Sequence, residues 1–212
     1  ELSEQEIPGQ VRELLGSYLE MARLIARRTA ELHVALASVT DDPDFAPEPF
    51  TGQYQRSLYQ SMRGRIRQTL AMLRQRLPLW PEPLREPAAR VAQSEDKLMR
   101  LAHRIFDRLI EAPRLRCHGH LHLGHLLFTG KDFLLIDLEG EADRSFAHRR
   151  RKRSPARDLA SLHRSLQEAA LTALTQGGIR TEDVPTLEPW ARFWQRWASV
   201  VFIKEYRAAP GT

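Results

Sequence analysis

The chain has 212 residues, of which 42% are hydrophobic and 28% charged, and its formal net charge is +5. This ordinary globular composition suffices for one substantial hydrophobic core. The single cysteine, Cys117, excludes an internal disulfide, and no apolar run is long enough for a membrane span or a signal peptide, so we expect a reduced, cytoplasmic setting without membrane partners.

The first half of the chain has the pattern of amphipathic helices. Apolar residues recur at helical spacing on a charged background, and this periodicity predicts three helices, at about 10–39, 54–77 and 87–110. The first could break near Gly16. A loop with three prolines at 41–50 separates the first two, and four prolines within 78–87 end the second.

The stretch His118-Gly-His-Leu-His-Leu-Gly-His125 places four histidines within eight residues. Two short apolar runs follow, separated by Thr129-Gly-Lys-Asp132, and this alternation of apolar runs and turn residues predicts a β-hairpin at about 126–137. The polar segment Asp137-Leu-Glu-Gly-Glu141 comes directly after it. Nearly all residues able to do chemistry therefore lie at the two ends of one hairpin.

Helices are expected again in the last third. Five consecutive basic residues, Arg149-Arg-Arg-Lys-Arg153, precede Ser154-Pro155, which has the pattern of a helix cap followed by proline in the first turn. That helix should run to about Thr175, and another begins after Thr181. The expected fold is mainly α, with five to six helices around a β-hairpin.

The order His-Gly-x-x-His-Leu-Gly, hairpin, Ile-Asp-x-Glu-Gly-Glu and Arg-Arg-Arg-Lys-Arg-Ser-Pro-x-Arg-Asp resembles the C-terminal lobe of maltokinases. Upstream phrases, Arg27-Arg-Thr-Ala-Glu-Leu-His33 and Phe45-Ala-Pro-Glu-Pro-Phe50, extend the likeness over most of the chain. These kinases are related to aminoglycoside phosphotransferases and are often fused to trehalose synthase. The resemblance implies ATP-dependent phosphorylation of maltose to maltose 1-phosphate, in glycogen or α-glucan metabolism.

The resemblance also implies a division of the chain. Residues 1–112 would form the helical part of a kinase-like C-terminal lobe, 113–143 the catalytic and metal loops, and 144–212 the basic segment and final helices. The glycines before His118 are Gly9, Gly16, Gly52 and Gly64, and none belongs to a Gly-x-Gly motif. The nucleotide-binding lobe of a kinase is therefore expected outside this sequence, in the same or another chain, as is a trehalose synthase partner.

Site residues follow position by position from the family pattern, whose catalytic loop reads His-Gly-Asp-x-His-Leu-Gly-Gln. His118 matches the opening histidine, which is usually structural, and Asp158 matches an aspartate that supports the loop. Asp137 matches the main magnesium ligand, and Glu139 and Glu141 match the following acids. Lys152 and Arg153 in the basic run would face phosphate or substrate.

Two positions depart from the pattern. His120 stands where the family has its aspartate base, and His125 replaces the glutamine that helps to hold metal. A neutral imidazole can accept a proton, but it lacks the negative charge that would hold the acceptor hydroxyl. Magnesium prefers oxygen ligands, so His125 shifts the preference toward a transition metal. We expect catalysis with Mg²⁺ and ATP, which the resemblance alone implies, to be impaired in the isolated chain.

Two rival interpretations do not use the family. The histidines His118, His120, His122 and His125, with Asp137 and Glu139, could form a transition-metal site, and alternation along an extended segment would put the first three on one side. Alternatively, the chain is a non-catalytic pseudokinase or interaction module that uses Arg149–Arg153 for an acidic partner. Nucleic acid is the less favoured partner for that run. Cys117 is expected to be a small core residue.

Overall fold

The computed structural model describes residues 6–141 and 144–211, which fall into two compact units. Residues 1–48 and 114–212 belong to one, here called the site unit, and residues 49–113 to the other, the helical unit. Residues 1–112, which we expected to form one part of the lobe, therefore contribute to both units. The expected boundary at residue 143 lies outside the described residues.

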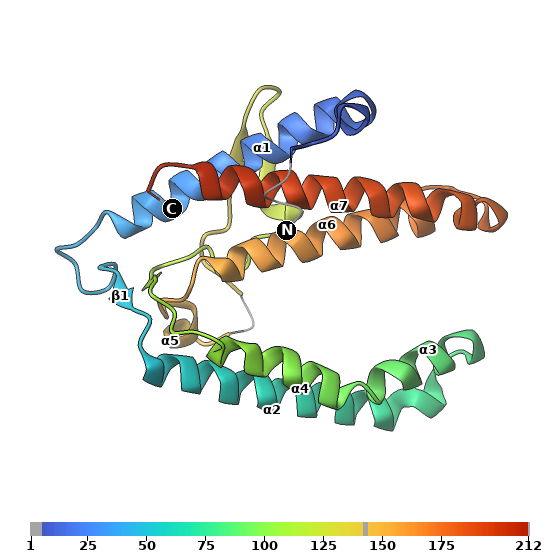
Figure 1. The fold of residues 1–212 in the computed structure, drawn as a ribbon, viewed down its shortest axis with the longest axis horizontal. Coiled ribbons are helices and arrows are strands. Elements are labelled where there is room, and N and C mark those ends of the chain that lie inside the picture. Colours follow the sequence, from blue (N-terminus) through green and yellow to red (C-terminus); the bar gives the residue numbers. More distant parts are fainter. Residues whose placement is uncertain (1–5, 142–143, 212) are drawn as a thin grey trace. The chain divides into compact units, whose positions relative to one another are not determined.

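Three long helices form the frame of the site unit. They are α1 (Gly9–Ala37), α6 (Ala156–Gln176) and α7 (Val184–Ala208), and α7 packs against both α1 and α6 (Figure 1). The expected break at Gly16 does not occur. Because nothing lies within 4 Å of the place where its Cβ would be, this glycine serves no close approach and α1 continues through it.

Two apolar clusters hold these helices together. In the first, Ile25 and Ala30 of α1 meet Leu162 of α6 and Phe202 of α7, and all are buried. The second is centred on Leu19, Val11, Ala22 and Val201, with the partly buried rings of Phe193 and Trp197 against it. Val201 and Phe202 of α7 thus lie in the core, although Trp190 of the same helix remains 58% exposed.

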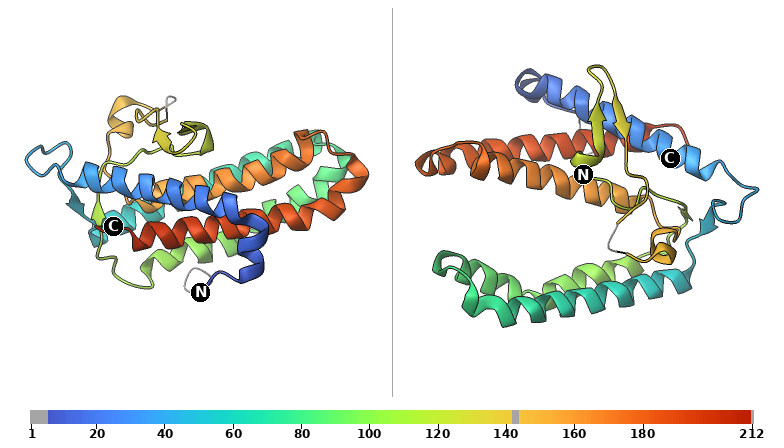
Figure 2. Two further views of the ribbon diagram at one scale, coloured as in Figure 1. Left: turned by 90° about the horizontal axis from the view of Figure 1, so that it is seen from above. Right: turned by 180° about the vertical axis from the view of Figure 1, so that it is seen from behind.

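The predicted hairpin is present, as β3 (Leu126–Phe128) and β4 (Phe133–Leu135) in antiparallel register. Leu126, Phe133 and Leu135 pack against the first core cluster. The turn is fixed to α1, because the Arg28 guanidinium donates to both carboxylate oxygens of Asp132 at 2.8 and 2.7 Å. Figure 2 shows the hairpin beside α1.

Shorter elements complete the site unit. A 3₁₀ turn, η4 (Leu123–His125), precedes β3; α5 (Phe146–Arg149) lies in the basic segment; η5 (Thr181–Asp183) leads into α7. The two-residue strands β1 (Glu48–Pro49) and β2 (Pro113–Arg114) pair with each other, and each has one residue in the site unit and one in the helical unit. No helix in the described part of the chain is sufficiently long and apolar to cross a membrane.

The helical unit consists of α2 (Gly52–Arg76), η2 (Leu77–Leu79), α3 (Glu82–Ala92), α4 (Glu95–His103) and η3 (Arg104–Phe106). The prediction of a single helix at 87–110 is therefore wrong. The helical segment begins earlier, at Glu82, and is divided at Gln93 and Ser94. At the division Arg74 donates to the Ala92 carbonyl at 2.8 Å and also to Glu95. A basic group on a terminal carbonyl ends a helix favourably.

The prediction of a mainly α chain around a β-hairpin is confirmed. The described residues contain the seven α-helices α1 to α7 rather than five or six, because one expected helix is two and the four-residue α5 was not foreseen.

Candidate functional site

The loop His118–His125 is anchored in the core by its central leucine. Leu121 is 0% exposed and belongs to the same cluster as Leu162 of α6. Since successive residues of an extended segment point to opposite sides, the buried Leu121 places His120 and His122 on the other side, where both are half-buried. The loop is also fixed to α6 by the Leu123 amide, which donates to Ser165 Oγ at 3.0 Å.

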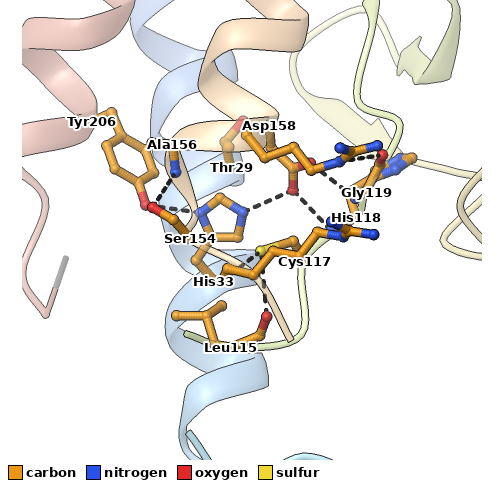
Figure 3. A network of polar contacts seen from close by, with 12 residues as sticks. Thr29, His33, Leu115, Cys117, His118, Gly119, Ser154, Ala156, Asp158 and Tyr206 are labelled. Carbon is orange, nitrogen blue, oxygen red and sulfur yellow. Dashed lines mark hydrogen bonds and ion pairs between the residues drawn. The ribbon is translucent and has the colours of Figure 1, made fainter. Parts of the chain in front are cut away.

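The opening of the loop is held by Asp158, in the first turn of α6. This carboxylate is 0% exposed and accepts hydrogen bonds from the backbone amides of His118, at 2.8 Å, and Gly119, at 2.9 Å (Figure 3). Gly119 has φ +82°, a left-handed conformation that glycine adopts without steric cost. The two bonds and this conformation together define the course of the chain into His120.

A third donor to Asp158 comes from α1. His33 Nε2 lies 3.1 Å from Asp158 Oδ2, and His33 Nδ1 lies 2.8 Å from the Tyr206 hydroxyl of α7. A carboxylate only accepts, so Nε2 carries the proton and Nδ1 accepts from the hydroxyl. Figure 3 shows the imidazole between its two partners. A buried carboxylate needs such donors, because its desolvation is costly.

The ring of His118 connects the loop to the end of β4. It is 1% exposed, and its Nε2 donates to the Ile136 carbonyl at 2.9 Å. Nδ1 has no hydrogen-bond partner among the described residues, and burial lowers the pKa of this imidazole. A neutral ring with one bonded nitrogen suits a structural group that fixes the residue before Asp137.

Asp137 is thereby brought beside the loop. Its side chain is 68% exposed, and its Oδ2 lies 3.6 Å from Nε2 of His125. His125 is in turn oriented by its Nδ1, which lies 2.8 Å from the His120 carbonyl oxygen. Asp137 has φ +60°, in the left-handed region that non-glycine residues seldom adopt. Such conformations are concentrated at functional sites.

Three imidazoles gather here, although not the three that alternation predicted. His120, His122 and His125 each offer a nitrogen, and these atoms lie within 4.8 Å of one another. The 3₁₀ turn returns His125 to its neighbours, whereas His118 is bonded to Ile136 in the interior. Burial, followed by the nearby imidazoles of His125 and His120, lowers the pKa of His122.

The two acids that follow Asp137, Glu139 and Glu141, differ in their exposure and in their contacts. Glu139 has an exposed side chain, and its carbonyl lies 3.4 Å from an Arg149 nitrogen. Glu141 is paired with Arg144, at 2.8 Å, and with Arg157. Burial alone would raise the pKa of Glu141, but the hydrogen bond from Arg144 and the charge of Arg157 hold it below its usual value. Glu141 is thus the ion-pair partner of both arginines.

The basic segment is largely engaged within the site unit. Lys152 is 9% exposed, and its ammonium contacts the Pro43 carbonyl at 2.5 Å and Glu48 at 3.1 Å. Arg153 lies 2.9 Å from His148 Nε2, and Arg150 pairs with Asp44. These contacts fasten the segment to the proline-containing loop before β1, so the Lys152 ammonium is directed into the protein.

The donor set fits magnesium only in part. Mg²⁺ is commonly held by one or two carboxylates together with water and phosphate oxygens, so the exposed carboxylate of Asp137 suits it, whereas the nitrogen of His125, 3.6 Å from that carboxylate, does not. Mixed nitrogen and oxygen donors suit a transition metal better.

Three contributors were not assigned a role from the sequence. His33 and Tyr206 complete the Asp158 network, and Arg157 donates to the Gly119 carbonyl at 3.1 Å. Arg157 precedes Asp158, and His33 ends one of the family-like phrases, so both had a local signal. Tyr206 had none, because it lies outside every motif that resembles the family.

No family model matches the chain. Three solved structures of glucosamine kinase are similar to it, each at 21% identity over 90% of this chain. The TM-score is 0.72 for the complex with glucosamine, ADP and inorganic phosphate, and 0.71 for two further crystal forms, B and A. The chain spans only 40 to 41% of the length of those kinases. The predicted kinase-like fold is confirmed.

Proposed function

We propose that this chain is the C-terminal lobe of a maltokinase-like protein, which phosphorylates maltose to maltose 1-phosphate with ATP in glycogen or α-glucan metabolism. One observation carries the proposal. The loop His118–His125 is bonded to Asp158 at its start, and its last residue, His125, lies 3.6 Å from Asp137. The residues that resemble a kinase's catalytic loop and metal loop thus meet at one site, in a chain with a kinase-like fold.

Within this proposal His120 would receive the proton of the sugar hydroxyl. Its imidazole is half-buried at the site, on the residue that follows the fixed amides of His118 and Gly119. A neutral imidazole can act as a general base. It brings no negative charge to hold the hydroxyl, so turnover should be slow compared with an aspartate in the same place.

The nucleotide is assigned to another lobe, in the same or another chain, and a trehalose synthase is a separate proposed partner. The part of the chain before His118 supports this, because its glycines lie outside any Gly-x-Gly motif and its described residues form helices and two strands of two residues each. The isolated chain should therefore lack measurable affinity for ATP, and calorimetric titration showing micromolar binding would contradict the assignment.

The decisive experiment uses the protein together with its nucleotide-binding lobe. Sugar-dependent ADP formation is measured with maltose, glucosamine and glucose as acceptors. We expect slow turnover that prefers maltose, and faster turnover in His120→Asp, because a carboxylate adds the negative charge that holds the acceptor hydroxyl and that a neutral imidazole lacks. His103→Asp, on the exposed end of α4, is the matched control and should leave the rate unchanged.

Equal rates in wild type and His120→Asp would refute the proposed role of position 120. Preference for glucosamine would retain the kinase but reject maltose. Saturable maltose binding without any ADP formation in either variant would instead favour a pseudokinase. The engagement of Lys152 and Arg150 inside the site unit weighs against an interaction module built on the basic run.

A further inference from the structure

The excess positive charge of the chain is confined to the helical unit. Residues 49–113 contain 12 arginines and lysines but only 6 aspartates and glutamates, which gives a formal charge of +6. The rest of the chain contains 20 basic and 21 acidic side chains, a formal charge of −1. Eleven of the 12 cations are arginines, which bind phosphate through a planar pair of donors. A unit with so one-sided a balance attracts polyanions.

Half of those cations are arginines that the unit's own acids leave unpaired. Glu86, Glu95 and Asp107 pair with other arginines of the unit. Within the part of the chain that the structure describes, six arginine side chains make neither an ion pair nor a hydrogen bond: Arg56, Arg63, Arg65, Arg76, Arg100 and Arg108. Arg63 is half-buried and the other five are exposed. Their guanidinium groups are available to an external anion.

Two of these arginines lie beside an aromatic pair. Tyr59 of α2 and Phe106 of η3 have ring centroids 5.1 Å apart and planes that meet at 64°. Arg56 precedes Tyr59 by three residues and Arg63 follows it by four, so both lie next to Tyr59 on one face of α2. Roughly 10 Å of helix axis separates the two arginines. Arg56, Tyr59, Arg63 and Phe106 are called here the aromatic–arginine patch.

Phe106 is held in place from α2. It follows α4, which packs along α2 (Figure 1). The buried Gln55 side chain of α2 donates to the carbonyl of Arg108, at 3.0 Å, and to that of Ile105. Phe106 is 37% exposed, and in an edge-to-face pair the faces of one ring stay uncovered by the other. The patch therefore presents a fixed, partly exposed aromatic surface beside two unpaired cations.

We propose that the helical unit binds single-stranded nucleic acid at the aromatic–arginine patch. A base stacks on the exposed ring of Phe106, and the guanidinium groups of Arg56 and Arg63 bind phosphates of the same strand. Aromatic platforms within a cationic surface are the usual means by which proteins bind single strands without reading their sequence. The patch lies wholly within residues 49–113, and its assignment does not depend on the proposed kinase function.

The aromatic pair distinguishes a single strand from other anionic partners. A guanidinium donates equally well to a phosphate or a carboxylate, so the arginines alone do not select the partner. A base has a flat face that stacks on a ring, whereas neither a lipid headgroup nor an acidic side chain has one. In a duplex the bases are stacked on one another and their faces are not accessible. Single-stranded nucleic acid is therefore the partner that uses both parts of the patch.

The test uses the full chain and fluorescein-labelled oligo(dT) and oligo(U) of about 12 nucleotides, in fluorescence anisotropy titrations. We expect both to bind with a Kd on the order of 10⁻⁶ to 10⁻⁴ M at physiological salt. Unlabelled oligo(dT), a duplex of the same length, polyglutamate and phosphatidylserine vesicles are then added as competitors. Only the unlabelled single strand should displace the probe at matched concentration of negative charge.

Three variants of the patch test its two parts separately. Phe106→Leu keeps an apolar side chain but removes the ring, and it should weaken oligo(dT) binding about tenfold. Arg56→Gln and Arg63→Gln should each weaken binding and reduce the slope of log affinity against log salt concentration by about 0.7, the value for one phosphate contact on a single strand. Circular dichroism checks that each variant is folded.

The matched controls lie in the site unit. Arg196→Gln removes an exposed cation from α7. Phe146→Leu removes a ring that is 65% exposed and has the guanidinium groups of Arg149 and Arg150 over it, at 5.9 and 5.1 Å from its centroid. Both controls should bind oligo(dT) with the affinity and salt slope of the wild type.

Wild-type affinity in Phe106→Leu, or an unchanged salt slope in both arginine variants, would overturn the proposal. A loss in Phe146→Leu in place of Phe106→Leu would move the binding to the basic segment and overturn the assigned site. Polyglutamate, vesicles or duplex that compete as well as unlabelled oligo(dT) would overturn the assigned partner. None of these measurements uses ATP or sugar, so their failure is distinct from a failure of the proposed kinase function.

Discussion

Nε2 of His33 lies 3.1 Å from Oδ2 of Asp158, and this contact joins α1 to the helix that supports the candidate catalytic loop. Both side chains are buried, at 3% and 0% exposure. Asp158 also accepts hydrogen bonds from the amides of His118 and Gly119. The position of the loop therefore depends on a polar network inside an otherwise apolar core.

Replacing Asp158 by asparagine should lower the free energy of unfolding by about 1–3 kcal/mol, because one acceptor oxygen becomes an amide that faces a buried donor. Urea denaturation measures the loss, and hydrogen exchange should become faster at the amides of His118 and Gly119. Asp41→Asn, at an exposed loop position, should change stability by less than about 0.5 kcal/mol. Unchanged exchange at both amides would show that Asp158 does not hold the loop.

Tyr206→Phe should lower the free energy of unfolding by about 0.5–1.5 kcal/mol. The change removes the hydroxyl that donates to His33 and leaves the buried ring in place. Tyr18→Phe is the matched control, since Tyr18 is 54% exposed on α1. Equal effects of the two substitutions in urea denaturation would argue against an energetic role for the Tyr206–His33 bond.

Stability should fall at alkaline pH for a specific reason. Burial raises the pKa of Cys117 from 9.0 to about 12, and burial likewise raises the pKa of Tyr206 from 10.0 to about 12. In the unfolded chain both groups lose their protons at lower pH. The stability they contribute is therefore complete below about pH 9 and is lost as pH rises toward 12.

Urea denaturation at a series of pH values between 8 and 11.5, roughly the window in which only the unfolded chain ionises these groups, checks this. The double variant Cys117→Ala/Tyr206→Phe should start from lower stability but show a shallower alkaline decline. The same slope in wild type and double variant would assign the decline to other groups.

Two glycine substitutions in the site unit should change the free energy of unfolding in opposite directions. Gly119→Ala introduces a side chain at φ +82° and should cost about 1–2 kcal/mol. Gly16→Ala lies within α1, where nothing stands within 4 Å of the new Cβ, and should stabilise the protein by about 0.4–1 kcal/mol. Thermal denaturation of the pair compares them directly. A stabilising effect of Gly119→Ala would mean that the loop does not need its left-handed residue.

The sequence by itself determined the helices α1, α2, α6 and α7 and the β3–β4 hairpin, because apolar spacing and turn residues act over a few positions along the chain. It also placed Asp137 and His125 at the two ends of that hairpin, close enough in sequence for the antiparallel register to bring them together. The division between α3 and α4 was missed; the Arg74 side chain that contacts both helices there comes from α2, and periodicity along the chain does not reveal such a contact.

Only the tertiary structure decided which polar groups meet. His33, Asp158 and Tyr206 come from three different helices, and their contact depends on how α1, α6 and α7 pack rather than on any local pattern. Packing also buried Lys152 against Glu48 and turned the ring of His118 inward, leaving His125 to join His120. Periodicity shows which face of an element is apolar, whereas the pairing of distant polar side chains is set by the packed core that holds them.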